Sequence, residues 1–184
     1  MRLTDRYRVS IQERSNKVTC WETASEDDYW RSYGQHDAPA GEFVEVDAGG
    51  TVSCALDAAG EAHCWGWEEH GQTQPPAGPF RSLDVGYAYA CALRSADSSI
   101  VCWGQDIFGE TVAPDGAEFI LVDCGENTSC AIDQTARVVC WGESPRLPDN
   151  VSELSFRDVS IDRHTACGVT VDGEIVCWEA LERR

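Results

Sequence analysis

Cysteine pairs that recur with a tryptophan are the feature of this sequence that most limits its fold. Four segments open with cysteine and close with cysteine and tryptophan: CALDAAGEAHCW, CALRSADSSIVCW, CAIDQTARVVCW and CGVTVDGEIVCW. A fifth, SIQERSNKVTCW, keeps the second cysteine but begins with Ser10. The opening cysteines, at positions 54, 91, 130 and 167, are 37, 39 and 37 residues apart. A repeat of this length indicates a small structural unit that buries its apolar surface by stacking on copies of itself.

Each cysteine-bounded segment is predicted to form a β-hairpin. In the copy from Cys54, the loop would end on Gly60 at positive φ, where glycine costs least. This register places Cys54 opposite Cys64 in a non-hydrogen-bonded pair, where facing side chains lie closest, so a cross-strand disulfide is reasonable. The same reasoning predicts four disulfides: Cys54–Cys64, Cys91–Cys102, Cys130–Cys140 and Cys167–Cys177. The alternative is pairs of buried free thiols, and Cys20 and Cys124 have no partner in their own hairpins.

A third strand is expected before each complete hairpin, in the segments FVEVDAGG, FRSLDVGY, FILVDCGE and FRDVSIDR. The first copy lacks such a segment. The hairpin strands are apolar on both faces, so neighbouring copies must cover both. Prolines and glycines in the connections cannot continue a central strand. We therefore predict an all-β fold, a β-propeller or open propeller-like arc of about five short blades with roughly three strands per blade.

The repeats extend through residues 1–184, which we treat as a single domain. The copies lie at approximately 1–42, 43–79, 80–118, 119–155 and 156–184. The recurring tryptophans follow the strand period and are expected to pack in the core: Trp21, Trp65, Trp103, Trp141 and Trp178. Setting Ser10 opposite Cys20 gives the first hairpin a half-polar face of Ser10, Gln12, Val18 and Cys20. We expect this to be a less buried terminal blade.

The chain is strongly acidic, with 14 basic and 32 acidic residues and a formal charge of −18. This charge repels phosphate, so nucleic acid and anionic membranes are poor partners, whereas a basic protein surface would be attracted. The alternative is that the acidity only provides solubility. Ten cysteines favour a secreted or periplasmic protein. The polar N-terminus carries no secretory signal and fits a cytoplasmic protein if Met1 is the native start, so the localisation stays open.

The pattern CAL…G…CWG, followed by a GQ-containing loop and a phenylalanine-led strand, resembles the repeat of the regulator of chromosome condensation family. The short, cysteine-paired form is similar to bacterial members, among them the secreted propellers that inhibit β-lactamases. The resemblance covers nearly the whole chain and implies a propeller whose loops bind proteins. It implies two special cases, guanine-nucleotide exchange and enzyme inhibition, and the repeat itself cannot choose between them. No catalytic residue is carried over.

The number of copies departs from this family, whose propellers usually close with seven blades. Five hairpins could close as a five-bladed ring, in which the incomplete first and last copies complement each other. They could otherwise form an open arc or part of something longer. In that case a second copy of the chain, or another chain, could complete the structure.

Loops after the hairpins carry the candidate binding residues. Fourteen positions separate Cys20 from Gly34, against seven from Cys64 to Gly71, and the inserted segment is both acidic and aromatic. Equivalent loops leave the same rim of a propeller, so we predict one aromatic and acidic partner-binding surface. Its members are Asp27, Asp28, Tyr29, Trp30, Tyr33, Trp67, Glu68, Glu69, Asp106 and Phe108. The alternatives are a solvated loop and a lectin that binds carbohydrate through the aromatic rings.

An enzyme would need a nucleophile, a base and an oxyanion site, or a metal, brought together. The four histidines fall at unrelated repeat positions: His36, His63, His70 and His164. Zinc is disfavoured because structural zinc sites usually use close cysteine pairs, and the nearest pair here is Cys124 and Cys130. We therefore expect a non-enzymatic protein without metal or cofactor.

Overall fold

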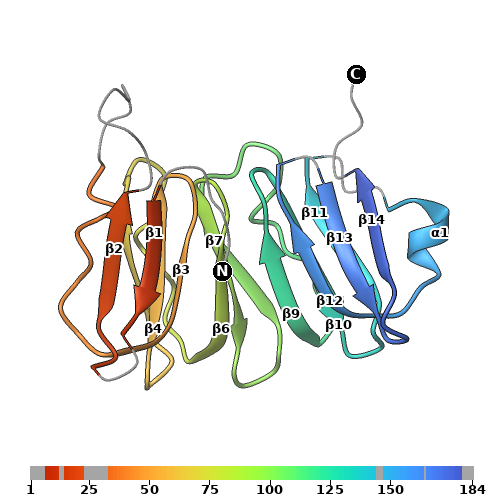
Figure 1. The fold of residues 1–184 in the computed structure, drawn as a ribbon, viewed down its shortest axis with the longest axis horizontal. Coiled ribbons are helices and arrows are strands. Elements are labelled where there is room, and N and C mark those ends of the chain that lie inside the picture. The colour runs from red at the N-terminus through yellow and green to blue at the C-terminus, as the bar shows by residue number, and fades with distance from the viewer. Residues whose placement is uncertain (1–6, 13–14, 23–32, 144–146, 164, 180–184) are drawn as a thin grey trace.

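The computed structural model describes residues 7–12, 15–22, 33–143, 147–163 and 165–179. Within this part of the chain, strands form five antiparallel sheets that follow one another in sequence order (Figure 1). The first sheet has two strands and the other four have three each. The strands are β1 (Tyr7–Ile11), β2 (Val18–Glu22), β3 (Phe43–Ala48), β4 (Val52–Asp57), β5 (Ala62–Gly66), β6 (Phe80–Val85), β7 (Tyr89–Arg94), β8 (Ile100–Gly104), β9 (Phe119–Cys124), β10 (Thr128–Asp133), β11 (Val138–Gly142), β12 (Phe156–Ile161), β13 (Thr165–Thr170) and β14 (Ile175–Glu179), and one helical turn, α1 (Asp149–Ser152), precedes β12.

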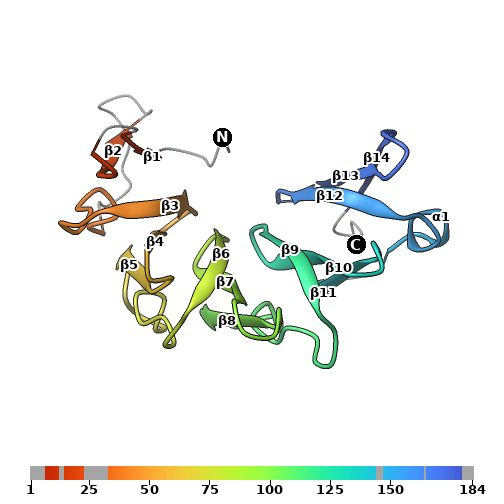
Figure 2. The same ribbon diagram turned by 90° about the horizontal axis from the view of Figure 1, so that it is seen from below.

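Each sheet is one blade of an open arc. The first strands of the three-stranded blades, β3, β6, β9 and β12, pack side by side toward the concave side of the arc (Figure 2). Among the described residues, the blade of β1 and β2 has no such inner strand. Figure 2 also shows that the first and last blades stand apart. The predicted all-β fold is confirmed, and the structure is the open arc rather than the five-bladed ring.

The registers of the four cysteine-bounded hairpins and all four predicted disulfides are confirmed. Cys54 lies opposite Cys64 with 4.1 Å between the Cα atoms, the short separation of a non-hydrogen-bonded pair. The other disulfides have the same arrangement: Cys91–Cys102, Cys130–Cys140 and Cys167–Cys177. Each of these hairpin loops includes one residue at positive φ: Gly60, Ser98, Ala136 and Gly173. Cys20 and Cys124 lie outside the four disulfides.

The first hairpin differs from the predicted register by one residue. Val9, and not Ser10, lies opposite Cys20, because the hairpin loop contains one more residue than was assumed. Such a shift moves every side chain of a strand to the other face. The half-polar face predicted for this hairpin is therefore wrong. Instead, an apolar set packs on the second blade: Ile11, Val18 and Cys20 lie against Phe43, Ala55 and Trp65.

The hydrophobic core lies between the blades. In the middle strand β7, every residue from Tyr89 to Leu93 is buried, so both faces of the strand are covered. Between the second and third blades, one cluster contains Val52, Cys54, Leu56, Phe80, Leu83, Val85, Ala90, Ala92 and Trp103. Four of the five recurring tryptophans are buried as predicted. The prediction is wrong for Trp21, which is 39% exposed on the outer face of the first blade.

Polar contacts between neighbouring blades repeat along the arc. An aspartate near the end of three inner strands accepts a hydrogen bond from the backbone of the next inner strand: Asp47 from Val85 (2.8 Å), Asp84 from Cys124 (2.6 Å) and Asp123 from Ile161 (2.8 Å). At the other end, the first inner-strand residue donates its backbone N–H to the preceding hairpin loop: Phe43 to Asn16, Phe80 to Gly60, Phe119 to Ser98 and Phe156 to Ala136. These contacts fix the orientation of each blade on its neighbour.

Candidate protein-binding rim

Three connections, called here the GQ loops, follow β2, β5 and β8 and lie on one rim of the arc. Each carries a glycine followed by glutamine or glutamate: Gly34–Gln35, Gly71–Gln72 and Gly109–Glu110. They share a rim because the last strand of each blade ends at the same edge of its sheet. The hairpin loops lie on the opposite rim.

Each GQ loop is bound by the tryptophan of the next blade. The indole Nε1 of Trp65 donates to the carbonyl oxygen of Gln35 at 2.8 Å. The equivalent bonds run from Trp103 to Gln72 (3.1 Å) and from Trp141 to Glu110 (2.8 Å). A buried indole needs such an acceptor, so the tryptophans anchor the rim as well as fill the core.

The glutamine or glutamate side chain turns back into its own loop. Gln35 Oε1 accepts from the backbone N–H of Tyr33 at 2.6 Å, and Gln72 Oε1 accepts from that of His70 at 2.7 Å. The carboxylate of Glu110 accepts two backbone N–H groups, those of Ile107 and Phe108. All three side chains are buried. The rim loops are therefore held by their own buried polar groups, which the sequence prediction did not identify.

Aromatic side chains of the first two GQ loops lie close together. The ring centroids of Tyr33 and Trp67 are 5.9 Å apart, and the His70 ring lies edge-on to Trp67 at 5.3 Å. Tyr33 and His70 are exposed and Trp67 is half-buried. Phe108 is exposed on the next loop along.

The predicted acidic residues differ in their surroundings. Glu68 accepts hydrogen bonds from Thr73 N (3.0 Å) and from the Gln74 side chain (2.5 Å), so it shapes its own loop. Asp106 similarly accepts from Thr111 N at 3.3 Å. Glu69 is exposed. The remaining predicted residues, Asp27, Asp28, Tyr29 and Trp30, lie outside the described residues.

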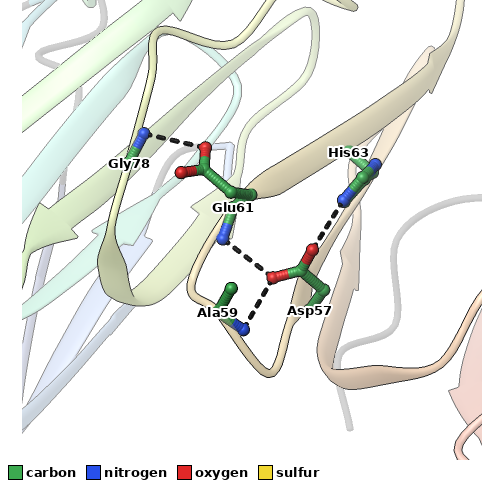
Figure 3. Close-up of polar contacts among 5 residues, drawn as sticks. All are labelled: Asp57, Ala59, Glu61, His63 and Gly78. Atoms are coloured by element: carbon green, nitrogen blue, oxygen red, sulfur yellow. Dashed lines mark hydrogen bonds and ion pairs between the residues drawn. The ribbon is translucent and has the colours of Figure 1, made fainter.

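On the opposite rim, the polar contacts join a hairpin loop to the connection that leads to the next blade (Figure 3). Asp57 Oδ1 accepts from the backbone N–H groups of Ala59 (2.9 Å) and Glu61 (3.0 Å), and Oδ2 lies 3.1 Å from His63 Nε2. The hydrogen bond with His63 is the main cause of a lowered pKa of Asp57. Glu61 accepts from the N–H of Gly78 at 3.1 Å. These contacts stabilise the loop.

Two other kinds of feature are missing from the part of the chain that the structure describes. The described residues contain no group of three or more His, Cys, Asp or Glu side chains that could hold a metal ion. They also contain no helix long and apolar enough to cross a membrane. Two of the four histidines contact other side chains, His63 that of Asp57 and His70 the Trp67 ring.

The stacked blades and the loop rim together define a propeller-type repeat protein. Residues 43–72 and 119–146 match the model of the regulator of chromosome condensation (RCC1) repeat. The family resemblance seen in the sequence is thus confirmed.

Solved structures share the fold over 96% of this chain. They include the ectodomain of the Physcomitrella patens receptor kinase CR4 (25% identity, TM-score 0.78) and the CRINKLY WD40 ectodomain of the Arabidopsis thaliana receptor kinase ACR4 (23%, 0.75). Prp20p from Saccharomyces cerevisiae, described together with its binding properties to Gsp1p and histones, is 15% identical with a TM-score of 0.76. The chain spans 50%, 64% and 56% of these three chains, respectively.

Proposed function

We propose that this chain is a non-enzymatic interaction module that binds a protein partner through the GQ-loop rim. The observation that carries the proposal is the combination of exposed aromatic rings with loops fixed by buried hydrogen bonds. Tyr33, His70 and Phe108 offer rigid contact area, while Gln72 and Glu110 hold the backbone beneath them. Aromatic side chains presented in a fixed geometry are typical anchors of protein interfaces.

Charge favours a basic partner. The chain has a formal charge of −18, and Glu68, Glu69 and Asp106 lie on the rim. Complementary charge mainly raises the association rate and makes it depend on salt. Prp20p, which shares the fold, is described with histones among the proteins it binds, and histones are basic. Nucleotide exchange on a GTPase and inhibition of an enzyme would be special cases of the same binding.

The test uses a purified dimer of core histones as a basic protein probe. Biolayer interferometry would compare the wild-type chain with a triple rim variant, Glu68→Gln, Glu69→Gln and Asp106→Asn. The matched control neutralises three exposed acidic residues of the last blade away from the GQ loops, Asp158→Asn, Asp172→Asn and Glu174→Gln. We expect the rim variant to associate about tenfold more slowly at low salt and the control to remain near wild type.

Equal association rates for the rim variant and its control would overturn the proposed basic-partner surface. A glycan array addresses the lectin alternative. Saturable glycan binding that is lost in Trp67→Ala, but kept in the triple rim variant, would replace protein binding by carbohydrate recognition.

A further inference from the structure

One GQ loop exposes an unusual amount of apolar surface. In the loop Gln105–Val112, called here the Phe108 loop, the side chains of Ile107, Phe108 and Val112 are 63%, 45% and 65% exposed. They lie beside the exposed carboxylate of Asp106 in a chain with a formal charge of −18. Exposed apolar side chains gathered on one short loop are a feature of interaction sites rather than of ordinary surface.

A buried carboxylate fixes this loop from beneath. Glu110 is 1% exposed, and its Oε1 accepts from Ile107 N at 3.1 Å while its Oε2 accepts from Phe108 N at 2.6 Å. These are the backbone groups of two protruding residues of the loop. The Glu110 carbonyl also accepts the Trp141 indole of the next blade at 2.8 Å. The apolar side chains therefore project from a backbone that is held at three points.

The neighbouring GQ loop shows what glutamate adds at this position. Gln72 occupies the equivalent site, is fully buried, and accepts one backbone N–H, that of His70. Its Nε2 has no hydrogen-bond partner among the described residues. An amide has one accepting oxygen where a carboxylate has two. Glutamate at position 110 thus holds one more backbone group than glutamine does at position 72.

We propose that the Phe108 loop is a preformed knob that inserts Ile107 and Phe108 into an apolar pocket of a protein partner whose rim is basic. This inference rests on the proposed function and names the part of the rim that contributes most affinity. A protruding apolar group requires an apolar pocket on the partner. Lys or Arg around the mouth of that pocket would be attracted by the nearby acidic side chains, Asp106 and, on the adjacent loop, Glu68 and Glu69. Glu110 is a positioning residue, because it lowers the entropy lost on binding without touching the partner.

The positioning role is tested on the isolated chain by amide hydrogen exchange followed by NMR. In Glu110→Gln, we expect the amide of Ile107 or Phe108 to exchange at least about tenfold faster, because one acceptor is lost. The reciprocal variant Gln72→Glu should newly protect the amide of Glu69, the position equivalent to Ile107. Wild-type amides of Ile107 and Phe108 that exchange as fast as an unprotected loop would overturn the role of Glu110.

The docking role is tested by photo-crosslinking. A benzoylphenylalanine replaces Phe108, Trp67 or, as a control on the opposite rim, Val171, which is also exposed. Each variant is irradiated in an extract of the source organism, and the captured protein is purified and titrated calorimetrically. We expect capture through position 108 and an affinity loss of about tenfold or more in Phe108→Ala, with a smaller loss in Glu110→Gln and none in Val171→Ala.

The outcomes separate the two proposals. Capture through position 67 with unchanged affinity in Phe108→Ala would leave the rim as the binding site and overturn the knob. Capture only through position 171, or no saturable binding by any purified captured protein, would overturn both proposals.

Discussion

The carboxylate of Asp84 in the third blade accepts a hydrogen bond from the backbone N–H of Cys124 in the fourth blade, at 2.6 Å. The same bond joins Asp47 to Val85 and Asp123 to Ile161. At the equivalent position of the last blade the residue is Ser160, which is exposed. A buried acceptor of this kind stabilises the stacking of blades only where a following blade supplies the donor.

Replacing Asp84 with alanine is expected to lower the free energy of unfolding by about 2–3 kcal/mol, because the Cys124 N–H is left buried without this acceptor. The matched change Ser160→Ala should alter it by less than about 0.5 kcal/mol. Urea denaturation monitored by tryptophan fluorescence measures both. Equal losses in the two variants would contradict the assigned role.

Glycine at position 49 is required by close approach of two blades rather than by its φ. A Cβ atom at this position would collide with the carbonyl oxygen of Gly86. Gly49→Ala should therefore cost about 3 kcal/mol, since a backbone group must move. Gly116→Ala is the control, because Gly116 has a φ of +79° but open space around it, and it should cost about 1 kcal/mol. Thermal unfolding of both variants shows whether the steric collision at position 49 or the positive φ at position 116 costs more stability.

Ala136 holds a φ of 65°, a conformation that costs an L-residue with a Cβ atom roughly 1 kcal/mol. We expect Ala136→Gly to raise the free energy of unfolding by about 0.5 kcal/mol, after the greater freedom of glycine in the unfolded chain is included. Gly173→Ala, at the equivalent position with a φ of 91° and open surroundings, should lower it by about 1 kcal/mol. Urea titration of both variants should show changes in the free energy of unfolding that have opposite signs.

The lowered pKa of Asp57 makes its stabilising contribution depend on pH. The ionised carboxylate is favoured in the folded protein, so the contribution is present above the pKa of the unfolded chain and is lost as the pH falls through the folded pKa. Asp57→Asn keeps an oxygen for the N–H groups of Ala59 and Glu61 but removes the charge that faces His63. Melting temperatures of wild type and Asp57→Asn should differ at about pH 6 and converge at about pH 2. A constant difference would exclude the charge as the cause.

The disulfide of the last blade should be the first to be reduced. Cys177 is exposed, and Ile175 on the same strand is 74% exposed, because no described element covers this face of the blade. In the other three hairpins, the opening cysteine is buried. With limiting dithiothreitol, we expect Cys167–Cys177 to open about tenfold faster than the other three, since exchange requires access to sulfur. Differential alkylation and peptide mass spectrometry give the four rates.

Local patterns in the sequence predicted the repeating unit well. The cysteine spacing and turn residues fix each hairpin, and Gly49, Gly86 and Gly125 begin the turns that follow the inner strands. The prediction failed at the first hairpin, where no second cysteine marks the register and Val9 takes the place assigned to Ser10. One extra loop residue could not be seen without that marker.

Contacts between repeats were not predictable in the same way. The Asp47, Asp84 and Asp123 bonds, and the indole bonds to the GQ loops, join residues about one repeat apart and depend on the angle between blades. The GQ dipeptide was visible as a recurring motif, but its internal hydrogen bonds arise from the loop conformation. The rings of Tyr33 and Trp67 lie close together, and the partner-binding role of this rim stays a prediction.

Each indole hydrogen bond joins a GQ loop to a tryptophan that lies later in the chain. Gln72 receives its bond from Trp103, and Glu110 from Trp141, so each loop depends on a tryptophan located 31 residues later in the chain. During synthesis, a loop emerges from the ribosome before the residue that completes it. The surface of every GQ loop is thus finished only when the succeeding blade has been translated, and a truncated nascent chain would always end in one unfinished loop.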